Sequence, residues 1–217
     1  MPIDKKKLLN TLKEMKQEYI SNTGAVRSSK FINKLHDYSE YELELRIKKS
    51  TKLELKPEAQ IYGSHKAKKV DVTLLLKDNG PIVAISLKSQ MSSIAKNFGD
   101  RYEALIGDAT GLHEKFPFLV FGMLYLLPFN TNLGPAIDET PPFEKIERNL
   151  ITITNRKDFD DRSSKYEHFA LLVVDFEKDP PQIVSEYPKN KDLKIDNFFD
   201  NLIDTFEKRT PELDIRK

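Results

Sequence analysis

The chain has 217 residues, of which 39% are hydrophobic and 32% charged, a composition typical of a folded domain and too apolar for disorder. It contains no cysteine, which excludes disulfides, thiolate zinc sites and cysteine nucleophiles and predicts a reducing, cytoplasmic location. The formal net charge of +1 does not by itself indicate a nucleic-acid-binding protein. The basic N-terminus lacks the continuous apolar run of a signal peptide or a membrane span.

Two helices are predicted at the start of the chain. Apolar side chains recur at spacings of three and four over residues 4–20, which indicates an amphipathic helix. A second stripe of this kind begins near Ser28 and includes Phe31, Ile32, Leu35 and Tyr38. It predicts a second helix, which extends or restarts through Leu45.

Between residues 53 and 90 the apolar period becomes two, which predicts a meander of strands. A two-residue turn at Asn79-Gly80 would place residues opposite each other when their numbers add to 159. Asp71 then lies opposite Lys88, and Thr73 opposite Ser86, on one polar face of the hairpin. The other face is apolar and is expected to join the core; it carries Val70, Val72, Leu74, Leu76, Val83, Ile85 and Leu87.

The remaining elements predict an α/β fold. A helix begins at Ser92 or Ser93 and runs to about His113, and residues 116–129 form a strand buried on both faces. A loop over 130–143, a short helix, a second buried strand near 168–177 and a helix over 196–209 follow. We therefore expect one domain over 1–217, with a central mixed sheet and helices on both of its faces. Residues 1–50 form its helical N-terminal part, and residues 129–217 complete the sheet and end in a helix.

The predicted hairpin resembles the motifs of the PD-(D/E)XK nucleases, a superfamily that includes many type II restriction endonucleases. Val70-Asp71 is similar to the first motif and Ser86-Leu87-Lys88 to the second, and the resemblance covers roughly residues 58–128. It implies a restriction-endonuclease-like fold with its catalytic core in residues 53–128. Ser86 stands where the family usually has an acid. One branch of restriction enzymes is similar in having serine there and a substitute glutamate on the following helix.

The resemblance implies a Mg²⁺ site on this hairpin. Asp71 and Glu103 would bind the metal, and the carbonyl of Leu87 would add a ligand. Lys88 would orient the attacking water or stabilise the transition state, and Gln90 would position water or phosphate. Other candidates for the acid missing at Ser86 are Glu58 and, after it, Glu42 or Glu44.

Two basic segments are candidates for DNA contacts or for ordinary solvated surface. His65, Lys66, Lys68 and Lys69 lead into the strand of Asp71, where they would approach DNA phosphates. The segment 157–169 would offer Arg162 and Lys165 to base edges. The remaining histidines are expected to be structural or exposed, because they form no pair at metal-ligand spacing; they are His36, His113 and His168.

We therefore expect a Mg²⁺-dependent type II restriction endonuclease that cuts double-stranded DNA at a short specific site. Cleavage of both strands of a symmetric site implies a homodimer, and such an enzyme implies a cognate DNA methyltransferase in the same cell. One alternative is a catalytically inactive DNA-binding or interaction protein on the same scaffold. Another is a repair or mobile-element nuclease.

Overall fold

The computed structural model describes residues 1–21, 29–129 and 143–217. Within these ranges the chain forms a six-stranded sheet with the strand order β1-β2-β3-β4-β5-β6. The strands are β1 (Leu53–Tyr62), β2 (Ala67–Leu76), β3 (Gly80–Ser89), β4 (Val120–Pro128), β5 (His168–Asp175) and β6 (Gln182–Ile183). The helices are α1 (Lys5–Ser21), α2 (Ser29–Arg46), α3 (Ile94–Lys115), α4 (Phe143–Thr152) and α5 (Phe198–Arg209).

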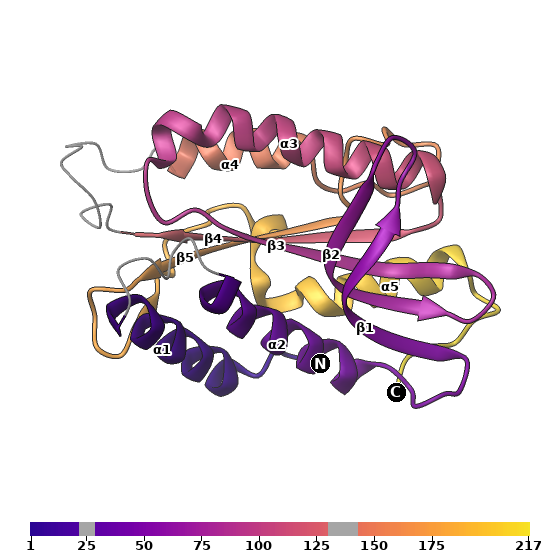
Figure 1. The fold of residues 1–217 in the computed structure, drawn as a ribbon, viewed down its shortest axis with the longest axis horizontal. Coiled ribbons are helices and arrows are strands. Elements are labelled where there is room, and N and C mark those ends of the chain that lie inside the picture. The colour runs from indigo at the N-terminus through magenta and orange to yellow at the C-terminus, as the bar shows by residue number, and fades with distance from the viewer. Residues whose placement is uncertain (22–28, 130–142) are drawn as a thin grey trace.

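The sheet is mixed, and helices cover both of its faces, which confirms the predicted α/β class. β1, β2 and β3 form an antiparallel meander, β3, β4 and β5 are parallel, and β6 is antiparallel to β5. Parallel neighbours need a crossover connection, and α3 and α4 provide the two crossovers on one face. Figure 1 shows these two helices above the sheet and α1, α2 and α5 below it.

Two hydrophobic cores lie on the two faces of the sheet. The α1/α2/α5 core contains Val120, Leu124 and Leu126 of β4, whereas the α3/α4 core contains Phe121, Met123, Tyr125 and Leu127. Alternate residues of β4 therefore enter opposite cores, as expected for a strand buried on both faces. This confirms the interpretation of the apolar run, although β4 begins only at Val120, after Pro117.

The other helix and strand predictions hold with small shifts at the ends. The second helix is continuous through Arg46, and α5 ends at Arg209, directly before Thr210-Pro211. Ser93 is the N-cap residue of α3, but its side chain makes no capping hydrogen bond. The predicted loop over 130–143 lies outside the described residues except for Phe143, which begins α4.

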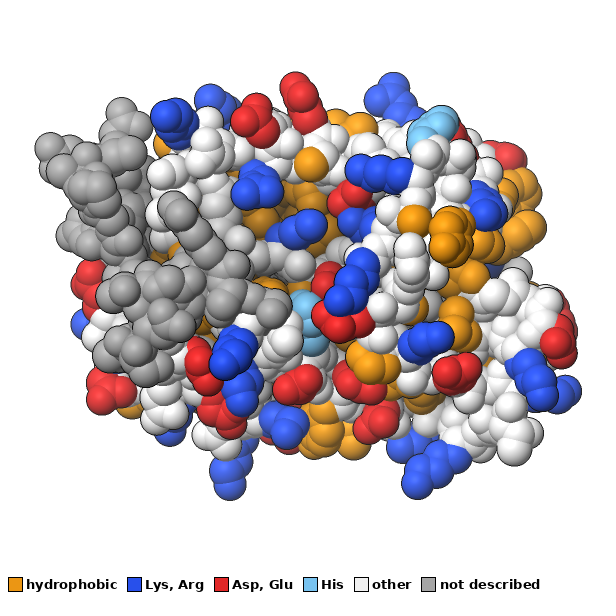
Figure 2. All heavy atoms as spheres, in the orientation of Figure 1, with side chains coloured by type: hydrophobic (Ala, Val, Ile, Leu, Met, Phe, Trp, Pro, Cys, Tyr) orange, Lys and Arg blue, Asp and Glu red, His pale blue; other side chains and the backbone are white. Residues whose placement is uncertain are grey.

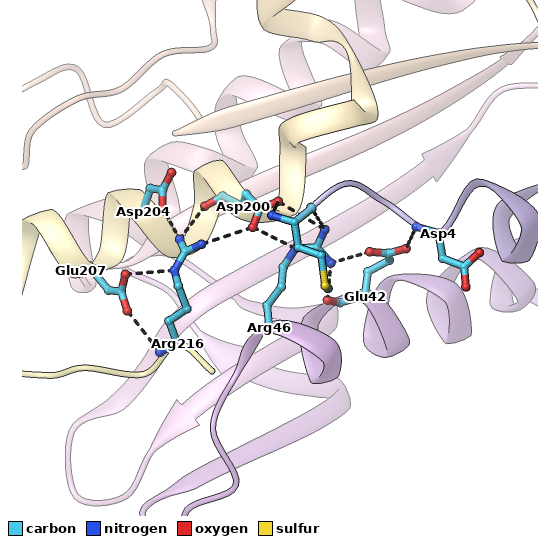
Figure 3. A network of polar contacts seen from close by, with 8 residues as sticks. Asp4, Glu42, Arg46, Asp200, Asp204, Glu207 and Arg216 are labelled. Carbon is cyan, nitrogen blue, oxygen red and sulfur yellow. Dashed lines mark hydrogen bonds and ion pairs between the residues drawn. The ribbon is translucent and has the colours of Figure 1, made fainter.

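A network of ion pairs ties both chain ends to α2 and α5 (Figure 3). The buried guanidinium of Arg46 contacts Glu42 at 2.5 Å and Asp200 at 3.3 Å, and it also donates to the Met1 carbonyl. Arg216 binds Asp200 and two further acids of α5. Glu42 is thus fully buried in a structural ion pair, which argues against its expected role as a metal ligand.

No helix in the described parts of the chain combines the length and the apolar character that a membrane crossing requires.

Candidate active site

The register of the β2–β3 hairpin differs from the predicted one. Thr73 pairs with Ala84, not with Ser86, and Leu76 pairs with Gly80. The turn spans three residues because Asp78 adopts a left-handed φ of 72°, and an irregularity between Leu74 and Leu75 adds one more residue to β3. The turn shifts the pairing by three residues and the irregularity reverses one of them, so the register moves by a net two residues and the predicted opposition of Asp71 and Lys88 is wrong. Thr73, Ser86 and Lys88 still lie on the same face, because a shift of two preserves the alternation.

Asp71 lies in a gap where β2 separates from β3. The β2–β3 ladder ends at the pair Val72 and Ile85, although both strands continue. Beyond this pair the backbone N–H of Leu87 donates to Oδ2 of Asp71 at 2.7 Å. The carboxylate therefore occupies the place of the next backbone acceptor of β2. The carbonyl of Leu87 points to the same side of β3 as its N–H group, that is, into the gap.

β1 and β2 both bend at the level of Asp71, and their apolar residues enter opposite hydrophobic cores before and after the bend. The pairs run from Pro57 with Val72 to Ala59 with Val70, and Glu58 between them has a left-handed φ of 51°. Val72 belongs to the α1/α2/α5 core, whereas Val70 and Ala59 belong to the α3/α4 core. The prediction that Val70 shares the apolar face of Val72 is therefore wrong. Because of this bend, the outer half of the β1–β2 hairpin curves over to α3 (Figure 1).

His36, which was expected from the sequence to be structural or exposed, lies beside Asp71. Nε2 of His36, on α2, is 3.3 Å from Oδ1 of Asp71, and this nitrogen is buried without a hydrogen bond of good geometry. Burial lowers the pKa of His36, and the charges of Asp71 and Glu58 oppose this shift. The lowered pKa favours a neutral imidazole at pH 7, with a ring nitrogen directed at the carboxylate.

Ser86 and Lys88 lie on the α3 side of β3. They align in the parallel ladder with Met123 and Tyr125, which are members of the α3/α4 core. Lys88 is exposed, whereas the Ser86 hydroxyl is buried and has no hydrogen-bond partner in the described residues. The position of the missing acid thus holds a small buried side chain next to an exposed ammonium group.

A second lysine lies close to this pair. Lys68 of β2 forms an ion pair with Asp108 of α3, and both side chains are only 11% exposed. Burial lowers the pKa of Lys68 and outweighs the opposing effect of Asp108, while the charge of Lys88 lowers it further and that of Asp71 raises it. Lys68 therefore interacts electrostatically with both Lys88 and Asp71, while it holds the Asp108 carboxylate in a largely buried ion pair.

Glu103 does not point toward the site. It is exposed and lies nine residues from both Ile94 and Leu112, two of the buried residues of α3. Nine residues are about two and a half helical turns, so Glu103 projects from the side of α3 opposite the sheet. Asp108, in contrast, is three residues from Leu105 and four from Leu112, on the flank of the buried stripe. The prediction that Glu103 binds the metal is therefore wrong.

The other predicted site residues serve mostly structural contacts. Gln90 is buried, accepts a hydrogen bond from the Tyr125 hydroxyl at 2.6 Å and donates to the backbone carbonyls of Ser93 and Ile94. It therefore holds the start of α3 and has no free group for water or phosphate. Glu44 is exposed near the end of α2, four residues C-terminal to Glu40.

The basic segment before Asp71 is largely neutralised by acids. Lys69 pairs with Glu58 at 2.8 Å, His65 lies 3.1 Å from Glu114, and Lys66 and Lys68 both contact Asp108. Close packing also fixes this segment. The N–H of Ser64 donates to the carbonyl of Gly111 at 2.7 Å, and a Cβ atom on Gly63 would lie 2.7 Å from the same oxygen. These cations mainly attach the β1–β2 hairpin to α3.

Arg162 and Lys165 lie at the other end of the parallel strands. They precede His168, which aligns with Gly122 near the start of β4, whereas Lys88 aligns with Tyr125. The ring of His113 beside them contacts Ser163 and the buried Glu167, and His168 contacts Thr205. These two histidines are structural, as predicted, and the two cations do not join the site.

The surface around the gap is hollowed. Figure 2 shows hydrophobic side chains at the bottom of a hollow between the α3 side and the α1–α2 side, with Lys or Arg, acidic and histidine side chains around it. No cluster of three or more His, Asp or Glu side chains suitable for a metal ion is found in residues 1–21, 29–129 and 143–217. Asp71 thus has His36 beside it and Lys68, the partner of Asp108, close enough to interact with its charge, but the described residues supply no group of three metal-ligating side chains.

Comparison with protein-family models, with curated proteins and with solved structures found no match to this chain.

Proposed function

We propose that this protein is a Mg²⁺-dependent DNA endonuclease whose active site is the gap between β2 and β3. The observation that carries the proposal is the Asp71 carboxylate, which accepts a hydrogen bond from the N–H of Leu87 one residue before Lys88. An anchored carboxylate, a backbone carbonyl directed into the same gap and a lysine ammonium group are the components that phosphodiester hydrolysis needs.

The donor atoms of the gap fit Mg²⁺. This ion prefers oxygen ligands, keeps several waters and is commonly bound by one or two carboxylates together with substrate phosphates. Asp71 and the carbonyl of Leu87 would hold it, so a site with few preformed ligands is compatible with binding together with DNA. Bound Mg²⁺ would polarise the phosphate and make a water nucleophilic at neutral pH.

Asp108 takes the place of Glu103 in this proposal as the acid that replaces the one missing at Ser86. It lies on the flank of α3 that faces β2, and its ion-pair partner Lys68 stands three residues before Asp71 on that strand. Chemically, the position that a carboxylate oxygen reaches matters more than the segment that carries it. Glu58 remains a weaker candidate, since it is half exposed and paired with Lys69.

The protein's own groups would divide the remaining work. The Lys88 ammonium would stabilise the negative charge that develops on the phosphate in the transition state. The neutral imidazole of His36, 3.3 Å from Asp71, would orient that carboxylate or accept a proton from a water bound to it. Lys68 would keep Asp108 in place until substrate binds.

The finer assignment is a type II restriction enzyme that acts as a homodimer on a short duplex site beside a cognate methyltransferase. The likeness of Val70-Asp71 and Ser86-Leu87-Lys88 to the nuclease motifs supports it. A second candidate function is DNA binding without cleavage. The serine at position 86 and the absence of a three-ligand cluster in the described residues favour that alternative.

Cleavage of a DNA of known sequence with Mg²⁺ tests the proposal. Discrete fragments indicate site-specific cleavage, scattered nicks indicate a repair-type nuclease, and binding without cleavage favours the second candidate. Lys88→Ala should lower the cleavage rate by about 10²–10³-fold, the usual cost of losing one group that stabilises a transition state. Lys77→Ala, which removes another exposed lysine of the same hairpin, is the matched control.

Paired variants test the two acids. Asp71→Asn keeps an oxygen that can accept from the N–H of Leu87, so the fold should persist. It removes the negative charge that would bind Mg²⁺, so cleavage should be abolished. Asp108→Asn should lower cleavage strongly, and Glu103→Gln should not, because Glu103 points away from the sheet. Full activity of Asp71→Asn or Lys88→Ala would refute the site, and the reverse ranking of the two α3 variants would refute the role of Asp108.

A further inference from the structure

A hollow of about 250 Å³ lies at the edge of the sheet, between β1, the start of β3 and the end of α3. Its polar and aromatic walls are Lys56, Gln60 and Tyr62 of β1 together with Lys115 and Phe116. β1 is the edge strand, so no other strand of the described residues covers its outer side. None of the residues assigned to the β2–β3 gap lines this hollow.

The charge of the hollow favours an anionic ligand. Both of its lysines are exposed, and its lining contains no acidic residue. Neither Lys56 nor Lys115 forms an ion pair with another described residue, whereas Lys66, Lys68 and Lys69 all contact acids. Two ammonium groups that pair with no described acid are thus available here, whereas the lysines of the basic segment before Asp71 are engaged by acids.

The aromatic walls favour a flat ligand. Tyr62 is 62% exposed, and its ring makes no contact with another ring or cation of the described residues. Phe116, which also lines the hollow, is half-buried, and the Lys115 ammonium lies 5.6 Å from the centre of its ring. Aromatic faces beside cationic groups are the combination with which proteins bind single-stranded nucleic acids without reading sequence.

We infer that this hollow binds a nucleotide, with the base stacked on Tyr62 and the phosphate attracted by Lys56 and Lys115. The choice of nucleic acid as its source rests on the proposed nuclease function. Tyr62 is four residues along β1 from Glu58, which lies at the level of Asp71. Four strand residues span ~13 Å, and about four stacked nucleotides of one DNA strand span the same length at 3.4 Å each. A strand cleaved at the gap would therefore reach the hollow.

Binding of a single-stranded oligonucleotide that contains 2-aminopurine tests the inference, with dAMP as a second probe. The measurement is made without Mg²⁺, so it does not require catalysis. Tyr62→Ala should weaken oligonucleotide binding roughly 5- to 150-fold, since base stacking on an aromatic side chain contributes about 1–3 kcal/mol. It should also remove the quenching of 2-aminopurine, whereas Tyr62→Phe should keep both.

Lysine variants test the phosphate contact. Changing Lys56 and Lys115 together to Gln should lower the slope of log K against log salt by about 1.4, or about 0.7 for each contact with a single strand. Lys13→Gln, which removes an exposed lysine of α1, should leave that slope unchanged. Oligonucleotide binding tighter than that of dAMP identifies a strand as the source, and equal affinity identifies a free nucleotide.

Two results would overturn the inference: unchanged affinity and quenching in Tyr62→Ala, or an unchanged salt slope in the double lysine variant. The outcome is distinguishable from failure of the nuclease proposal. If the protein binds 2-aminopurine DNA through Tyr62 but never cleaves DNA, the nucleotide site stands and the nuclease proposal fails. If the Tyr62→Ala variant cleaves normally and binds the oligonucleotide as before, only the nucleotide site is refuted.

Discussion

The carboxylate of Glu167 is fully buried between two arginines, a histidine and a backbone N–H group. Its side chain is 0% exposed, and its Oε1 accepts from the guanidinium groups of Arg156 and Arg209, both at 2.8 Å. Oε2 accepts from the N–H of Phe121 at 2.7 Å and lies 3.1 Å from Nε2 of His113. Glu167→Gln keeps the shape of this group and removes its charge.

The expected loss of stability is large. Removing one member of a buried ion pair typically costs about 3–5 kcal/mol, because the partner charge stays buried without compensation. Two arginines would lose their common anion here. The lowered pKa of Glu167 leads to a similar magnitude. Burial raises it, but His113, Arg209 and the N–H of Phe121 outweigh burial and lower it from 4.5 to about 2. That shift corresponds to about 3 kcal/mol in favour of the charged form.

The same pKa fixes the sign of the pH dependence. Because the folded-state pKa is the lower one, the stabilisation by Glu167 is complete above the unfolded-state pKa of 4.5 and is lost as the pH falls toward 2. Linkage predicts that about 2 kcal/mol of it has disappeared at pH 3. The difference in unfolding free energy between wild type and Glu167→Gln should therefore shrink by about that amount between pH 7 and pH 3.

Urea unfolding at a series of pH values measures this difference. Glu144→Gln, at an exposed acid paired with Lys189, is the matched control and should change the urea midpoint little. A difference between wild type and Glu167→Gln that stays constant from pH 7 to pH 3 would refute the electrostatic reasoning. A loss below about 1 kcal/mol at pH 7 would refute the structural role of the network.

Two further predictions concern His168 and the glycines near α3. Burial lowers the pKa of His168 from 6.5 to about 4, so the unfolded state binds more protons between these values and stability falls as the pH drops through that window. His168→Gln should therefore make the stability measured by urea unfolding less dependent on pH between pH 7 and pH 4. An equally steep decline in the variant would contradict the assignment. Gly63→Ala should destabilise the protein because its Cβ would lie 2.7 Å from the carbonyl of Gly111, whereas Gly107→Ala, with nothing within 4 Å, should stabilise α3 by about 1 kcal/mol. Thermal unfolding of the two alanine variants compares them, and a Gly63→Ala variant as stable as wild type would refute the close contact.

The fold followed from local patterns, because the periods of helices and strands are properties of short segments. The apolar run before Pro128 and the stripe of Leu8, Leu12 and Met15 predicted β4 and α1 correctly. The hairpin register did not follow, since it depends on the backbone of the turn. Nothing in the letters DNG indicates that Asp78 rather than Asn79 adopts the left-handed conformation that lengthens the turn.

The site was only partly predictable. The stripe of Phe98, Leu105 and Leu112 already shows which side of α3 is buried, so helical periodicity could have rejected Glu103 and pointed to Asp108. His36 could not be found in this way, because its contact with Asp71 joins two elements that are distant in the sequence. Only the packing of α2 under the bend of β2 brings the two side chains together.

The hydrogen bond between Leu87 and Asp71 has a consequence for local motion. The backbone proton of Leu87 is held by a carboxylate and not by a neighbouring strand, so its exchange with solvent requires only a small displacement of one side chain. The neighbouring proton of Ile85 lies at the last pair of the ladder, where exchange requires the strands themselves to separate. Anything that draws Asp71 away, whether a cation or a titrating neighbour, should accelerate exchange at Leu87 alone, so this single amide reports on occupancy of the gap without any catalytic assay.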